Sequence, residues 1–222
     1  MPRRKRIRTT STDGHGDDAW VPKSVRKLQN IRRDIAVEAA RIMATEGQRN
    51  FMTAKRKAAD RVGASTRVAL PSNREVEEEL RAYQGFFGGE AHEDNLASLR
   101  EVAIEVMRRL YDFSPRLVGP VLDGTADNHS RVSLHLFNDP PEAVLWHLDE
   151  LGVPFHEEQR RIRWHDGGHR HIQLLVTEVH GVNVELALFD LIDLRQAPPS
   201  PVDGRPQKRA PLPEVEILLA AA

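Results

Sequence analysis

The first half of the chain repeats apolar residues at steps of three and four, which is the spacing of one buried helical face. A first helix is predicted from Ser24 to Gly47. A second is predicted at residues 50–62, because Gly63 suits the left-handed position that follows a helix. The apolar stripe of the first helix consists of Val25, Leu28, Ile31, Ile35, Ala39 and Ile42.

Two further helices are predicted before the pattern changes. Ser72 and Glu75 have the spacing of a capping box, in which each side chain satisfies a free backbone N–H at the start of a helix. That helix ends at a Gly-Gly pair. A longer helix is predicted at residues 93–113, ahead of Pro115, because the residue before a proline avoids helical angles.

Beyond Pro115, short runs with alternating apolar and polar residues predict strands. The sequence HDGGH at residues 165–169 is typical of a hairpin turn. Trp146 has helical spacing and is expected in the core. Strands are predicted at 116–122, 131–137, 160–165, 171–179 and 182–194, a helix at 140–152, and a short last helix at 213–222 that is positioned to dock on the sheet.

These elements predict an α+β protein in which a sheet flanked by helices follows an all-helical N-terminal segment. We expect a disordered basic arm at 1–22, the helical segment at 23–90, the α+β domain at 91–195, and a proline-rich tail with the short helix at 196–222.

Composition narrows the class of protein. Of the 222 residues 40% are hydrophobic, which is enough to bury a core, and none is cysteine, which excludes disulfides and thiolate metal sites. No stretch approaches the roughly 20 apolar residues of a membrane span. We therefore expect a bacterial-type cytoplasmic protein with no membrane partner.

Charge is distributed unevenly along the chain. Residues 1–70 contain 17 Lys and Arg against 7 Asp and Glu, whereas residues 71–222 contain 15 against 26. This asymmetry predicts either a polyanion partner such as RNA, contact between the two halves, or only a solvated helix surface. Dimerisation through the stripe at 25–42 is a further prediction. The candidate nucleic-acid contacts are Arg3, Arg4, Lys5, Arg6, Lys55, Arg56 and Lys57.

The stretch 119–137, GPVLDGTADNHSRVSLHLF, combines two glycine turns with an alternating strand. Gly119-Pro120 forms the first turn, Gly124-Thr125-Ala126 the second, and Ser130 precedes Arg131-Val132-Ser133. This order resembles the polymerase-beta-like nucleotidyltransferase superfamily. Minimal members of that family have a Gly-Ser turn, a Gly-Thr-Ala and then Ser-Asp-x-Asp on a strand. The resemblance covers roughly residues 95–190 and implies a nucleotidyltransferase-like mixed sheet.

The resemblance also implies which chemistry is present and which is lost. The family holds magnesium with two carboxylates at i and i+2 of one strand and a third on a neighbouring strand, where Glu185 stands here. Arg131 and Ser133 occupy the Asp-x-Asp positions, and an arginine repels a metal but suits a phosphate. The implied nucleotide contacts are Gly119, Gly124, Thr125, Ser130, Arg131, Ser133 and His135, with Glu185 as the remaining catalytic candidate and no metal ligand assigned.

These residues lead to one expected function and two alternatives. We expect a protein that binds a nucleotide or nucleic-acid phosphate but is catalytically degenerate and has no assigned cofactor. The first alternative is an active magnesium-dependent enzyme that uses Glu185 with Asp123, Asp127 or His135. The second is a non-enzymatic scaffold for protein interaction.

Three other clusters are open to two interpretations each. The histidine-rich turn is a metal site or a plain hairpin. The acids after the first glycine are a displaced metal site or a hydrogen-bonded turn. The basic residues of the tail close over a ligand or, as we expect, form a solvated tail. The histidine-rich turn consists of His165, Asp166, His169 and His171. The acidic cluster consists of Asp123 and Asp127 with His129, and the basic tail residues are Arg205, Lys208 and Arg209.

Overall fold

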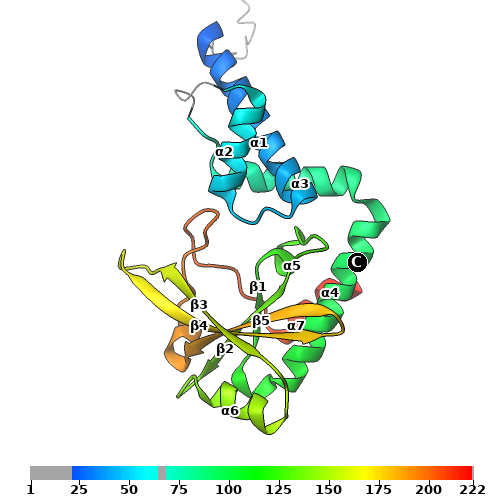
Figure 1. The fold of residues 1–222 in the computed structure, drawn as a ribbon, viewed down its shortest axis with the longest axis vertical. Helices are drawn as coiled ribbons and strands as arrows, with labels where there is room; N and C mark the ends of the chain where they lie inside the picture. Colours follow the sequence, from blue (N-terminus) through cyan, green and yellow to red (C-terminus); the bar gives the residue numbers. More distant parts are fainter. Residues whose placement is uncertain (1–21, 65–68, 222) are drawn as a thin grey trace, which may run out of the picture.

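Three helices gather at one end of the molecule and a five-stranded sheet forms the rest (Figure 1). The structure is a computed structural model that describes residues 22–64 and 69–221. The end helices are α1 (Lys23–Glu46), α2 (Phe51–Val62) and α3 (Asn73–Phe87), and α4 (Gly89–Arg109) leads from them along the sheet.

The helical segment forms for the reasons its sequence predicts. α1 and α2 end at Gly47 and Gly63, both in the left-handed conformation with φ of 64° and 68°. The capping box is present, since the backbone N–H of Glu75 donates to Ser72 Oγ and that of Ser72 donates to the Glu75 carboxylate. The apolar faces meet in one cluster of Ile35, Ala36, Ala39, Ile42, Ala54, Ala58 and Val76.

This cluster uses most of the apolar stripe of α1. Ile35, Ala39 and Ile42 are fully buried inside the chain. Val25 and Leu28 remain 40% and 52% exposed. Dimerisation through this helix therefore stays a prediction that depends on its first two turns.

The sheet is mixed. Its strands are β1 (Arg116–Val118), β2 (Val132–Asn138), β3 (His156–Arg163), β4 (His169–Val179) and β5 (Val182–Asp190), and their order is β1-β2-β5-β4-β3. Only β2 and β5 are parallel. The prediction of an α+β fold with a mixed sheet and a helical N-terminal part is confirmed.

Three strand predictions have a bound that is wrong by four residues. The run at 116–122 is a strand only to Val118, because Gly119 turns the chain and proline begins the short helix α5 (Pro120–Asp123). β3 begins four residues before the predicted run at 160–165. The run at 182–194 ends as a strand at Asp190 and continues as the 3₁₀ helix η2 (Leu191–Arg195).

One face of the sheet packs on helices, as its alternation predicts. Apolar side chains of β2 and β5 are buried against α4, α6 (Ala143–Glu150) and α7 (Leu212–Ala220); they are Val132, Leu134, Leu136, Val184, Leu186 and Leu188. α7 contacts α4 more than the sheet, and Arg100 of α4 donates to the Leu218 carbonyl. The prediction that Trp146 is in the core is wrong: it is 59% exposed, because Val144 and Leu148 form the buried side of α6.

Across residues 22–64 and 69–221, no helix combines the length and the apolar character that crossing a bilayer requires.

Candidate functional site

The sheet face away from α4 and α6 brings several predicted site residues together. This face of β2 carries Ser133 and His135, and Arg131, the residue just before the strand, lies on the same side. Ser133 is the register partner of Glu185 on β5. Because β2 and β5 are parallel and adjacent, Arg131 lies beside the same carboxylate, with Nη1 3.7 Å from Glu185 Oε2.

Glu185 is held by a second arginine. Its side chain is 5% exposed, and Arg160 of β3 donates from Nη1 and Nη2 to the two carboxylate oxygens at 2.7 and 2.5 Å. This is the bidentate geometry of a strong guanidinium–carboxylate pair. Arg131 makes a longer contact with Glu158, 3.3 Å from Nη1 to Oε1. The carboxylate is therefore neutralised before any ligand arrives.

The magnesium that the family resemblance implies does not fit these residues. Two of the three positions are Arg131 and Ser133, and both oxygens of Glu185 accept from Arg160. Unit charges of like sign about 4 Å apart repel by about 4 kcal/mol at an effective dielectric of 20. Within the part of the chain that the structure describes, no group of three His, Asp or Glu side chains could hold a metal ion.

His135 completes the polar face as a neutral acceptor. Burial, with the nearby charges of Arg209 and Arg160, lowers the pKa of His135 to about 3. The imidazole is therefore uncharged at neutral pH, and its Nδ1 accepts a hydrogen bond from Arg209 Nε at 3.1 Å.

Arg209 comes from the proline-rich segment between η2 and α7. Its guanidinium lies over the rings of Phe137 and Phe189, 4.8 and 5.2 Å from their centroids, and its Nη1 donates to the carbonyl of Asp193. Burial lowers its pKa to about 10, so it stays cationic at neutral pH. The expectation of a solvated tail is wrong for Arg209. It holds for Arg205 and Lys208, which are exposed.

The first glycine turn opens onto this face. Gly119 has φ of +73° and ψ of −155°, a conformation that essentially only glycine adopts. Apart from Gly119 and its two chain neighbours, no heavy atom of the described residues lies within 4 Å of the position that a Cβ would take there. Since Val118 pairs with Ser133, the open turn lies next to the polar end of β2.

The second glycine turn contacts helices instead. The carbonyl of Gly124 accepts from His92 of α4 at 3.2 Å, and that of Thr125 accepts from Gln84 of α3 at 3.0 Å. Ser130 closes a turn of its own by donating to an Asp127 carboxylate oxygen and accepting from the Asp127 backbone N–H. The groups named here on Gly124, Thr125 and Ser130, all predicted nucleotide contacts, thus form hydrogen bonds within the chain.

The basic residues predicted to contact nucleic acid do not form one exposed row where the structure describes them, at residues 55–57. Arg3, Arg4, Lys5 and Arg6 lie outside the described residues. Lys55 is buried, which lowers its pKa, and its Nζ donates to the Pro71 carbonyl at 3.0 Å. Lys57 pairs with Glu46, and Arg56 is exposed.

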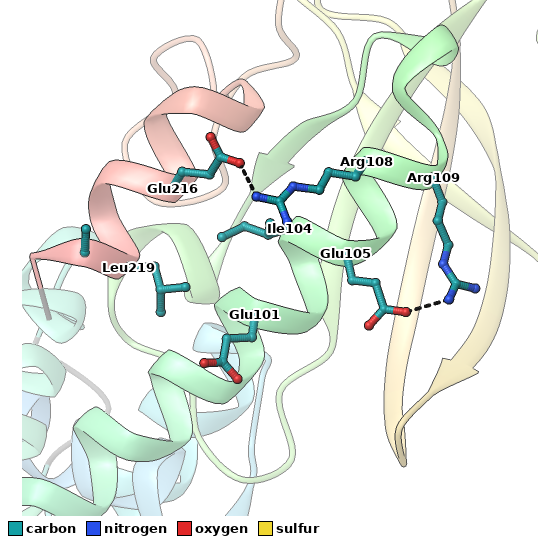
Figure 2. A pocket seen from close by; sticks show the side chains of 8 residues that line it. Glu101, Ile104, Glu105, Arg108, Arg109, Glu216 and Leu219 are labelled. Carbon is teal, nitrogen blue, oxygen red and sulfur yellow. Dashed lines mark hydrogen bonds and ion pairs between the residues drawn. The ribbon is translucent and has the colours of Figure 1, made fainter.

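A groove of about 770 Å³ lies between α4 and α7, apart from the sheet's polar face (Figure 2). Both of its arginines pair with acids that also line it. Arg108 lies 2.6 Å from Glu216 and Arg109 lies 2.8 Å from Glu105. These pairs leave the groove without an unpaired arginine for an anion.

Arg160 and Glu158 were missed from the sequence. Both lie on β3, whose first four residues were not predicted as strand, and their side chains face Glu185 only because β4 places β3 in that register. Glu158 and Arg160 are two positions apart, a spacing that, with the correct strand start, assigns both to one face.

No protein-family model, curated protein or solved structure matches this chain. Its own geometry is therefore the basis for assigning a function.

Proposed function

We propose that the chain is a catalytically degenerate nucleotidyltransferase-like protein that binds a nucleotide or nucleic-acid phosphate on the polar face of its sheet. Support comes from the order of elements: β1 is followed by a glycine turn, β2 and the residue before it carry the Asp-x-Asp positions, and the parallel neighbour β5 carries the third acid. The analogy in fold favours a nucleotide as the ligand, but the function has to be argued from the residues of the site.

The observation that carries the proposal is the contact between Arg131 and Glu185. It supports the proposal because a guanidinium lies 3.7 Å from the one remaining acid of the three that the family resemblance implies. Arg160 already neutralises the acid, and Arg131 keeps 30% of its side chain exposed with only long contacts to acids. Its remaining N–H groups can donate to a phosphate, as guanidinium groups do bidentately.

The open turn at Gly119 supplies room beside this arginine. A phosphate placed between the end of β1 and Arg131 meets the permissive glycine backbone on one side and a cation on the other. No magnesium is needed for charge neutralisation, because the protein's own cation performs it.

Titration of the full chain with ATP, followed by calorimetry, tests the proposal. Arg131→Ser should weaken binding by about tenfold or more, the effect expected when one charged hydrogen-bond donor is lost. Arg108→Gln is the matched control, since it removes an arginine of α4 that is 63% exposed and paired with Glu216 of α7. Equal affinities for the wild type and Arg131→Ser would overturn the proposal.

A second function, binding of a partner protein, is favoured by one observation. Phe86 and Phe87 are 82% and 68% exposed at the junction of α3 and α4. Paired exposed aromatics are enriched at protein interfaces. The test is affinity purification with the wild type and a Phe86→Ser, Phe87→Ser variant: this function requires a partner protein, free of nucleic acid, that the variant loses.

A further inference from the structure

The free end of the β3–β4 hairpin forms a two-stranded ribbon that extends beyond the rest of the sheet (Figure 1). The register of β4 with β5 begins at Leu174 paired with Ala187. Residues 160–163 and 169–172 therefore pair only with each other among the described strands. A ribbon of this kind has two faces, and its side chains alternate between them.

The inner face of the ribbon is neutralised. Arg160 pairs with the buried Glu185. Arg170 lies over the ring of Trp164 at 3.8 Å and contacts Asp193 at 3.1 Å. Each inner arginine thus has an acid within the chain.

The outer face has the opposite character. Arg161 is directly opposite His171, and Arg163 is directly opposite His169. All four side chains are exposed, and within residues 22–64 and 69–221 none of them forms an ion pair.

Two acids of the hairpin, Glu157 and Asp166, lie outside this group of four side chains. Glu157 is on the outer face but accepts from Gln173 at 2.8 Å, nearer the base of the ribbon. Asp166 is in the turn and accepts from the Gly168 backbone N–H at 2.8 Å. The outer face therefore becomes more basic from the base of the ribbon towards its tip.

Hairpin stability does not account for this arrangement. Basic side chains placed directly opposite each other contribute nothing favourable, and like charges there are destabilising. The turn itself is closed by a backbone hydrogen bond, in which the Trp164 N–H donates to the Gly168 carbonyl at 2.9 Å. An ordered ribbon with an unneutralised basic face is suited to a polyanion.

We propose that this outer face, formed by Arg161, Arg163, His169 and His171, binds a nucleic-acid duplex through its phosphates. Side chains two apart on a strand are about 6.6 Å apart, so Arg161 and Arg163 can contact separate phosphates. A two-stranded β ribbon also has a width that the major groove of B-form DNA admits. The surface lies on the opposite face of the sheet from Arg131 and is independent of the nucleotide site.

Fluorescence anisotropy with a labelled DNA duplex of mixed sequence tests this proposal on the full chain across a salt series. The logarithm of the binding constant falls with the logarithm of salt by about 0.9 for each phosphate contacted. The Arg161→Gln, Arg163→Gln variant should reduce that slope by about 1.8 and weaken binding at low salt by about tenfold or more. Circular dichroism confirms that the variant folds.

The matched control is Arg108→Gln with Arg109→Gln. It removes the same charge from α4, where both arginines are paired with acids (Figure 2). Duplex binding with an unchanged slope is expected for this control. The proposal is overturned if the full chain does not bind the duplex at low salt, if the hairpin variant keeps the wild-type slope, or if the control loses as much as the hairpin variant.

Discussion

Arg160 and Arg161 are neighbours on β3 and have opposite surroundings. Arg160 points to the inner face, where it closes on a buried carboxylate at 2.5–2.7 Å, whereas Arg161 is exposed and opposite a histidine. The same contrast separates Arg170 from His171 on β4. On this hairpin, the strand's alternation decides whether a basic side chain stabilises the fold or remains available to a ligand.

The largest expected effect compares these two neighbours directly. Arg160→Gln leaves Glu185 buried without its bidentate partner, so the free energy of unfolding should fall by about 3 kcal/mol. Arg161→Gln should change it by less than about 0.5 kcal/mol. Urea unfolding measures both. Similar losses for the two variants would show that the inner pair has no special structural role.

The next effect concerns the inner face alone and depends on pH. His135 has a folded pKa of about 3 against about 6.5 for an unfolded histidine, so below pH 6.5 the unfolded chain binds the extra proton. The stability that this histidine contributes is complete above pH 6.5 and is lost as the pH falls towards 3.

Between pH 6.5 and pH 5 this loss amounts to about 2 kcal/mol. His135→Asn should remove that part of the pH dependence, since asparagine does not titrate but can still accept from Arg209. Urea unfolding at the two pH values measures it. His171→Asn, on the outer face, is the comparison variant, and a pH dependence in His135→Asn equal to that of the wild type would contradict the account.

The smallest effect concerns the arginine from the proline-rich segment. Arg209→Met should lower the free energy of unfolding by about 1 kcal/mol, because the Nδ1 of His135 and the carbonyl of Asp193 lose their donor. Methionine keeps part of the contact with the phenylalanine rings. Arg163→Met on the outer face should have no measurable effect in the same thermal unfolding experiment. A loss at Arg163 as large as that at Arg209 would remove the distinction between the faces.

Local chemistry made part of the molecule predictable. The periodicity of α1, the glycines that end α1 and α2, and the capping box of α3 are local signals, and the structure confirms them. The alternation of apolar and polar residues along β2 and β5 likewise assigns Arg131 and Glu185 to the polar side of each strand. These two sides form one face of the sheet once the strands pair in parallel and in register.

What escaped prediction depends on contacts between distant segments. Arg160 reaches Glu185 only through the register of β3 on β4 and of β4 on β5. Thr125 has a turn sequence, but the partner of its carbonyl is Gln84, 41 residues earlier. Arg209 is in a proline-rich segment without periodicity, so no local pattern assigns it to His135.

The central claim is that Arg131 replaces metal in neutralising a bound phosphate. Its most direct test is the affinity of the full chain for ATP, measured by calorimetry in excess EDTA and again with saturating magnesium. The account predicts binding in EDTA that magnesium does not strengthen. Affinity that rises about tenfold or more on adding magnesium would contradict it.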